Sequence, residues 1–170
     1  RLQDRSHEIL VKRVAEEKVT LRESRSAAVI GRGPGISEDS LALARKMKKT
    51  SVRGKPVLIV DDEKNIRLAL SASLEPLGLE TDSAEDGREA LVKLRDKEFG
   101  IVLLDLRMPG LNGMDVLRQA IKSRPDIRVI ILSAYGTIDV AVEAMKLGAV
   151  DFIPKPFAPE EIRERVVRVL

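Results

Sequence analysis

The sequence predicts an α/β protein in which five strands form one doubly wound parallel sheet with helices on both faces, after a mostly helical N-terminal extension. From Val57 onward, short aliphatic runs alternate with stretches of helical periodicity. The aliphatic runs are apolar almost throughout, as strands are when helices cover both sides of the sheet. The stretches between them are long enough to form the helical crossovers that parallel strands require.

Five segments have the composition of strands. Three of them, VLIVD (57–61), IVLLD (101–105) and IRVIILS (127–133), are rich in Val, Ile and Leu. A fourth is AVDFIP (149–154), and a weaker one lies near Leu79–Asp82. We expect these five segments to form the sheet.

Between the strands, apolar residues recur with the i, i+3, i+4, i+7 spacing of an amphipathic helix. The recurring residues are Ile66, Ala69, Leu70, Ser73, Leu74 and Leu77; Ala90, Leu91 and Leu94; Met114, Leu117 and Ile121; Ile138, Ala141, Val142 and Met145; and Ile162, Val166, Val169 and Leu170. Gly78, Gly100 and Gly148 follow three of these stretches, where a glycine commonly ends a helix. Each predicted strand is therefore followed by a predicted helix.

Composition excludes several classes of protein. The 170 residues suffice for one full domain and a smaller appendage. The absence of cysteine excludes a disulfide framework, a thiol nucleophile and thiolate metal sites. No apolar run approaches the roughly 18–20 residues that a membrane span needs, and no secretory signal pattern is present. We expect a soluble cytoplasmic protein with no membrane partner.

Charge divides the chain into two parts. Residues 1–55 contain 14 Lys/Arg and 7 Asp/Glu, whereas residues 56–170 contain 16 and 20. We interpret residues 1–50 as an N-terminal extension or a fragment of an upstream domain of unknown function, 51–55 as a basic linker, and 56–170 as the main domain. The run RKMKKTSVRGK (45–55) has no interleaved aromatic residues, which favours a charged linker over a nucleic-acid contact.

Polar residues follow four of the predicted strands. Asp61 and Asp62 come at the end of the first, Asp105 ends the third, Ser133 ends the fourth, and Lys155 follows the fifth. The carboxyl ends of parallel strands meet at one edge, where ligands bind, so we expect these residues to converge. Three neighbouring carboxylates repel one another unless a cation lies between them. Oxygen ligands without His or Cys favour Mg²⁺ or Mn²⁺.

The same residues predict phosphoryl transfer. A carboxylate beside a divalent ion can attack phosphorus, because the metal neutralises charge on the transferred group. The Ser133 hydroxyl and the Lys155 ammonium are suited to bind the oxygens of the resulting acyl phosphate. Each acid taken alone has a structural alternative to this functional interpretation. Asp61 could be a helix N-cap, and Asp105 could be a turn former. Those alternatives do not account for the whole set.

Four spaced motifs, VLIVDDE, VLLDLRMPGLNG, ILSAYG and DFIPKPF, resemble the receiver domain of bacterial two-component response regulators. The resemblance covers residues 56–170 and is strongest to the receivers of nitrogen-regulator and related transcription factors. It implies the flavodoxin-like, CheY-like fold. It also implies that a histidine kinase phosphohistidine donates a phosphoryl group to an aspartate, which switches an output, here transcription. Such domains catalyse only their own phosphorylation and dephosphorylation and are not otherwise enzymes.

The resemblance assigns metal and acceptor roles. Asp105 takes the position of the phosphoacceptor, and Asp62 and Asp105 take those of the direct metal carboxylates. Asp61 is expected to bind the ion through water, and the backbone carbonyl of Arg107 to be a further ligand. The side chains of Arg107 and Tyr135 flank the site, and we expect them to set the lifetime of the phosphorylated state.

The resemblance also assigns switch roles. Ser133 takes the hydroxyl position, where Thr is commoner, and Lys155 takes the lysine position, so the Lys155–Pro156 bond is expected to be cis. Phe152 takes the aromatic switch position without the hydroxyl of the frequent Tyr, which excludes a switch that needs that hydrogen bond. Added charge at the acceptor is expected to draw Ser133 and Lys155 inward and to move Phe152.

The expected partners are a sensor histidine kinase and a second copy of the chain. The second copy is expected to bind the face made by the fourth helix, fifth strand and fifth helix of residues 56–170. The effector is expected in residues 1–50 or outside this chain, unless the protein is a single-domain relay, and any contact with nucleic acid is expected to be indirect.

Two rival functions stay open. A haloacid-dehalogenase-like phosphatase also uses an attacking Asp with Mg²⁺, but its D-x-D pattern has a second acid where this chain has Arg107. The second rival is an interaction module that works without phosphorylation.

Overall fold

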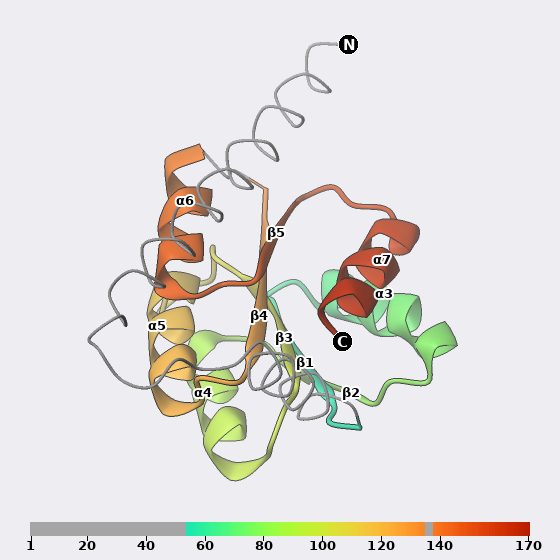
Figure 1. Cartoon of the computed structure of the whole chain (residues 1–170), viewed down its shortest axis with the longest axis horizontal. Coiled ribbons are helices and arrows are strands. Elements are labelled where there is room, and N and C mark those ends of the chain that lie inside the picture. The colour runs from blue at the N-terminus through green and yellow to red at the C-terminus, as the bar shows by residue number, and fades with distance from the viewer. Residues whose placement is uncertain (1–53, 135–137) are drawn as a thin grey trace, which may run out of the picture.

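The computed structural model describes residues 54–134 and 138–170 (Figure 1). The predicted extension at 1–50 and most of the predicted linker at 51–55 lie outside the described residues, as does Tyr135. The expectations for these segments therefore stay predictions.

The described residues form one five-stranded parallel sheet with helices on both sides. Its strands are β1 (Val57–Val60), β2 (Thr81–Ala84), β3 (Ile101–Asp105), β4 (Arg128–Ser133) and β5 (Asp151–Pro154), in the order β2-β1-β3-β4-β5. The helices are α3 (Lys64–Leu74), the short 3₁₀ helix η1 (Glu75–Leu77), α4 (Gly87–Asp96), α5 (Gly113–Ser123), α6 (Ile138–Leu147) and α7 (Pro159–Val169). The predicted doubly wound sheet is confirmed.

Alternate residues of each strand face opposite helical layers, as the pleat of a strand requires. In β1, Val57 and Ile59 pack in a cluster with α3 and α7, whereas Leu58 and Val60 pack in a cluster with α4, α5 and α6. Figure 1 shows α3 and α7 on one side of the sheet and the other three helices on the opposite side. Burial of each large aliphatic side chain contributes about 1.5–3 kcal/mol, so both clusters stabilise the sheet.

The second strand begins two residues later than the sequence predicts. The prediction centred on Leu79–Asp82, whereas β2 pairs with β1 from Thr81, opposite Val57. Leu79 supplies the apolar signal, but it packs against the cluster of α3 and α7 from the turn before the strand. Within the described sheet, β2 is an edge strand, and a polar sequence is tolerated there.

Two of the three glycines expected to end helices have left-handed backbone conformations. Gly78 has φ 65° and Gly148 has φ 114°, values that favour glycine. The expectation for Gly100 is wrong, because α4 already ends at Asp96 with an extended Lys97 behind it. Gly100 lies directly before β3 instead, where its N–H donates to the carbonyl of Pro56.

The loop after β3 returns the chain directly against the end of that strand. The Asn112 side chain caps α5 by accepting from the N–H of Asp115, and the N–H of Gly113 donates to the carbonyl of Leu106 at 3.1 Å. A Cβ at Gly113 would collide with the carbonyl oxygen of Asp105 and lie 2.6 Å from Cα of Leu106. Only glycine fits here without a shift of the backbone.

We predict that Gly113→Ala destabilises the protein by about 2 kcal/mol or more, because the added methyl group meets backbone atoms that cannot rotate away. Thermal unfolding followed by circular dichroism measures the effect. Gln119→Ala on the exposed side of the same helix is the matched control and should change the Tm little. Equal Tm values for the two variants would contradict the close packing at Gly113.

Candidate functional site

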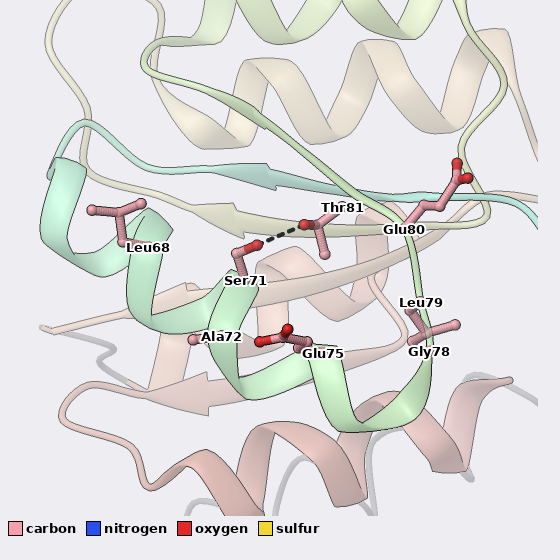
Figure 2. Close-up of a pocket in the computed structure, with 8 residues that line it drawn as sticks. All are labelled: Leu68, Ser71, Ala72, Glu75, Gly78, Leu79, Glu80 and Thr81. Carbon is pink, nitrogen blue, oxygen red and sulfur yellow. Dashed lines mark hydrogen bonds between the residues drawn. The ribbon is translucent and has the colours of Figure 1, made fainter.

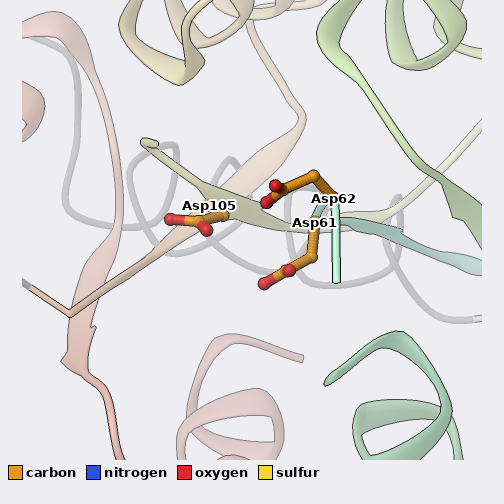
Figure 3. A group of neighbouring side chains, drawn as sticks. All are labelled: Asp61, Asp62 and Asp105. Atoms are coloured by element: carbon orange, nitrogen blue, oxygen red, sulfur yellow. The ribbon is translucent and has the colours of Figure 1, made fainter. Parts of the chain in front are cut away.

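Three acids meet at the carboxyl edge of the sheet. Val60 of β1 pairs with Leu104 of β3, so the residues that follow them, Asp61 and Asp105, lie side by side. One carboxylate oxygen from each of these two residues and one from Asp62 lie within 4.8 Å of one another. Figure 3 shows the three side chains gathered where the two strands end. The predicted convergence of the acids is therefore present in the structure.

Lys155 joins two of the acids from the end of β5. Its Nζ lies 2.6 Å from Oδ2 of Asp61 and 2.9 Å from Oδ2 of Asp105. The residues two places earlier, Ile59, Leu103 and Ile153, all pack towards α3 and α7, so alternation places the three polar groups on that same side. The peptide bond that follows Lys155 is cis, as expected from the resemblance.

Burial determines the electrostatics of this contact. The Asp61 side chain is fully buried, and burial raises the pKa of its carboxyl although hydrogen bonds from Lys155 and from the N–H of Glu63 oppose the rise. Burial alone would lower the pKa of Lys155, but the hydrogen bonds and charges of the two acids outweigh it, and its pKa is raised. Lys155 is therefore charged at neutral pH, whereas ionised Asp61 is costly.

The donor set fits a hard divalent cation. Three carboxylates face one ammonium, which leaves an excess of negative charge at the cluster. Asp62 is exposed, whereas Asp61 and Asp105 are buried, so the cluster opens to solvent on the Asp62 side. Oxygen donors of this kind suit Mg²⁺ or Mn²⁺ better than metals that prefer nitrogen or sulfur.

The other predicted residues lie around this cluster. Ser133 is buried at the end of β4, and its carbonyl accepts from the N–H of Lys155 at 2.8 Å. Phe152 is 6% exposed and belongs to the core cluster of α4, α5 and α6. Arg107 is exposed, and its N–H donates to Oδ1 of Asp105 at 3.1 Å. The roles predicted for these residues in switching and metal binding stay predictions.

Sequence reasoning missed the groups that shape the loop after β1. The N-cap of α3 is Glu63, not Asp61, and Oδ1 of Asp61 accepts from the N–H of Glu63 at 2.9 Å. Nη1 of Arg67 donates to the carbonyl oxygens of Asp61 and Asp62. The sequence contained one signal for this contact. Lys64 and Arg67 are cations near the start of α3, where the N-terminus of a helix favours acids instead.

A surface groove of about 470 Å³ lies apart from the acids, between α3, η1 and the edge strand β2 (Figure 2). Its lining residues are Leu68, Ser71, Ala72, Glu75, Gly78, Leu79, Glu80 and Thr81. The hydroxyls of Ser71 and Thr81 hydrogen bond to each other at 2.7 Å across its wall. None of the predicted site residues line this groove, so the acid cluster is the functional candidate.

Among the helices of residues 54–134 and 138–170, none combines the length and the apolar character needed to cross a bilayer.

Comparison with known families identifies the family to which the fold belongs. Residues 57–167 match the family described as the response regulator receiver domain. The chain belongs to this family. The predicted receiver is thus confirmed over most of residues 56–170, and its acid cluster lies at the edge where the motifs placed it.

Similar curated proteins fall into short and long types. The chemotaxis protein CheY of Thermotoga maritima is 39% identical over 117 residues, which are 68% of this chain and 98% of that protein. The transcriptional regulator NtrC of Salmonella typhimurium is 39% identical over 114 residues, which are 67% of this chain and 24% of that regulator. The luminescence regulatory protein LuxO of Vibrio campbellii is 39% identical over 108 residues, which are 64% of this chain and again 24% of the relative. This receiver spans about a quarter of each longer protein.

Solved structures agree with the receiver assignment. A CheY-like receiver from Methanospirillum hungatei has a TM-score of 0.65 and 31% identity, over 67% of this chain and 91% of that one. The response regulator TrrA of Thermotoga maritima, solved in complex with Mg(2+)-BeF, has a TM-score of 0.62 and 37% identity, over 68% and 99% of the two chains.

We predict that Asp61→Asn stabilises the metal-free receiver by a few degrees in Tm. The folded-state pKa of Asp61 lies above the ordinary 3.8, so the ionised group costs stability at neutral pH, and this cost disappears as the pH falls towards 3.8. Asn removes the charge and keeps one of the two oxygen acceptors, while Asp105 still accepts from Lys155. Thermal melts in EDTA at neutral and mildly acidic pH test this.

The exposed Asp96→Asn variant is the matched control and should change the Tm little at neutral pH. A lower Tm for Asp61→Asn than for the unmodified receiver at neutral pH would contradict the predicted cost of the buried carboxylate.

Proposed function

We propose that this receiver is a phosphorylation switch in which Asp105 accepts a phosphoryl group from the phosphohistidine of a sensor histidine kinase. The observation that carries the proposal is the meeting of Asp105, Asp61 and Lys155 from three strands, with Asp62 beside them. Similarity to CheY, NtrC and LuxO supports it.

In this proposal Asp61, Asp62, Asp105 and the backbone carbonyl of Arg107 hold a Mg²⁺ ion, with Asp61 acting through water. The bound ion would neutralise charge on the phosphoryl group during transfer. The all-oxygen donor set supports this assignment, and the similar TrrA structure is itself a complex with Mg(2+)-BeF. The same oxygen ligands also suit Mn²⁺.

Three side chains of the receiver, those of Asp105, Lys155 and Ser133, are assigned roles in the transfer itself. A carboxylate oxygen of Asp105 forms a bond to phosphorus while the bond between phosphorus and the histidine nitrogen breaks, and the imidazole leaves. Lys155 orients the Asp105 carboxylate beforehand and, because its raised pKa keeps it charged, can then bind a phosphoryl oxygen. The Ser133 hydroxyl is assigned to a second phosphoryl oxygen.

The switch follows from the added charge. Movement of Ser133 and Lys155 towards the phosphoryl group is proposed to shift Phe152 and the face made by α6, β5 and α7, which biases a two-state equilibrium. A second copy of the chain would bind at that face. The long relative NtrC, a DNA-binding transcriptional regulator, supports transcription as the output, controlled by a part of the protein outside residues 56–170. A cytoplasmic location accords with this role.

We predict that incubation with acetyl phosphate and Mg²⁺ adds one phosphoryl group to the protein, detected by intact mass spectrometry. Asp105→Asn should gain none, because it lacks the attacking carboxylate. Asp115→Asn, at a partly exposed position whose partner is Arg118, is the matched control and should be phosphorylated normally. A form without residues 1–50 should also be phosphorylated, since all proposed site residues lie beyond them.

Two outcomes would contradict the switch. Release of phosphate from many equivalents of substrate would identify a phosphatase. An unchanged mass, under conditions in which a known receiver is phosphorylated, would identify an interaction module that works without phosphorylation.

We predict that Arg107→Ala shortens the lifetime of the phosphorylated state severalfold, because the proposed role of this exposed side chain, two residues after the acceptor, is to obstruct the attacking water. Loss of the added mass over time, after removal of the donor, measures the rate. Arg88→Ala, at an exposed position of α4, is the control and should keep the original rate. The same rate in both variants would remove Arg107 from the lifetime role; Tyr135, outside the described residues, would then be tested alone.

A further inference from the structure

We propose that Arg67 is a positioning residue of the metal site, which holds the loop after β1 so that the carboxylates of Asp61 and Asp62 face Asp105. The inference deepens the proposed function and rests on it. Arg67 lies on α3 and belongs to none of the groups that would touch the ion or the phosphoryl group.

The main evidence is a pair of hydrogen bonds to consecutive carbonyl groups. Nη1 of Arg67 lies 2.7 Å from the carbonyl oxygen of Asp61 and 3.1 Å from that of Asp62. Successive carbonyls of an extended strand point in opposite directions. One donor can bind both only where the chain has left the strand and turned, so Arg67 selects the turned conformation at the point where the two acids stand.

A second hydrogen bond, to the side chain of Asp61, stabilises the same turn. Oδ1 of Asp61 accepts from the N–H of Glu63 at 2.9 Å, while its Oδ2 binds Lys155. The main chain of Asp61 is thus held by Arg67, and its side chain by Glu63 and Lys155. Together these contacts fix where the carboxylates of the loop project.

A cation at position 67 does not stabilise α3, because it lies near the N-terminus of that helix. The first turn of α3 has no acid and includes Lys64, although the N-terminus of a helix favours negative charge. The Arg67 side chain is nevertheless only 14% exposed and lies against the loop. The contacts to the two carbonyls account for a cation at this position, and helix stability does not.

The ion pair of Arg67 with Glu85 is too weak to explain the placement. Nη2 lies 4.0 Å from a carboxylate that is 71% exposed, and such surface pairs contribute little. Glu85→Gln therefore serves as a control that removes this contact and leaves the carbonyl contacts intact.

The charge of Arg67 and its contacts with the loop predict opposite effects of its removal on the affinity for Mg²⁺. As a positive charge against the loop that carries two of the acids, Arg67 opposes the binding of a cation, so charge alone predicts tighter Mg²⁺ binding after its removal. As the residue that positions the loop, it favours binding, because displaced carboxylates no longer converge. The direction of the change in affinity therefore distinguishes the two roles.

The test is isothermal titration calorimetry of the 170-residue, metal-free chain with Mg²⁺ alone. We expect Arg67→Ala to raise the dissociation constant about tenfold or more, as substitutions of groups that orient metal ligands do. Arg67→Lys, which can donate to one carbonyl, should have a smaller effect. The controls Glu85→Gln and Arg88→Ala should bind like the unmodified chain.

A second readout does not depend on the ion. In metal-free protein, the amide of Glu63 should exchange with solvent faster in Arg67→Ala than in the unmodified chain, because the loop loses its turned conformation. Amides of β3 should keep their exchange rates, which shows that the domain is folded. If Arg67→Ala fails to fold, Arg67→Lys carries both measurements.

The outcomes separate this inference from the proposed function. If the unmodified chain binds Mg²⁺ and gains a phosphoryl group while Arg67→Ala binds equally well or more tightly, the positioning role is overturned and the switch stands. If the unmodified chain neither binds Mg²⁺ nor is phosphorylated, the switch and the positioning role both fail.

Discussion

The site depends on one buried interaction, the contact of Lys155 with Asp61 and Asp105. Two carboxylates in the interior are tolerable only with a counter-charge, because each would otherwise lose its hydration without compensation. The lysine comes from the outer strand β5, 94 residues from one acid and 50 from the other. The same contact thus neutralises part of the charge and joins the ends of three strands at the edge where a phosphoryl group would bind.

The functional groups are held in place mainly through the backbone. The carbonyls of Asp61 and Asp62 bind Arg67, the carboxylate of Asp105 accepts from the N–H of Arg107, and Gly113 packs on the backbone at Asp105. These contacts constrain the main chain on either side of the acids and leave Asp62 exposed. A site supported in this way holds its acids in defined positions, which accords with the proposed phosphoryl transfer, because that reaction relies on positioning and charge.

The residues of the site lie on both sides of the sheet, towards both helical layers. Asp61, Asp105 and Lys155 each stand two places after a residue that faces α3 and α7. Ser133 stands two places after Ile131, which faces α4, α5 and α6, so alternation places Ser133 on that other side of the sheet. Phe152 lies in that second layer and pairs in register with Ile131. Ser133 is therefore the proposed phosphoryl contact best placed to influence the aromatic residue, which fits a switch read out at α6, β5 and α7.

The sequence by itself determined the sheet, the two-sided core and the residues at the strand ends, because apolar periodicity records burial directly and parallel strands must end at a common edge. It misplaced β2 by two residues, since an edge strand lacks the apolar signal and Leu79 supplied one from the preceding turn. Only the tertiary structure decided that Lys155 bridges Asp61 and Asp105, and that Arg67 and Gly113 shape the loops beside them. These contacts join distant segments or involve backbone atoms, which every residue carries, so no pattern of side chains along the chain records them.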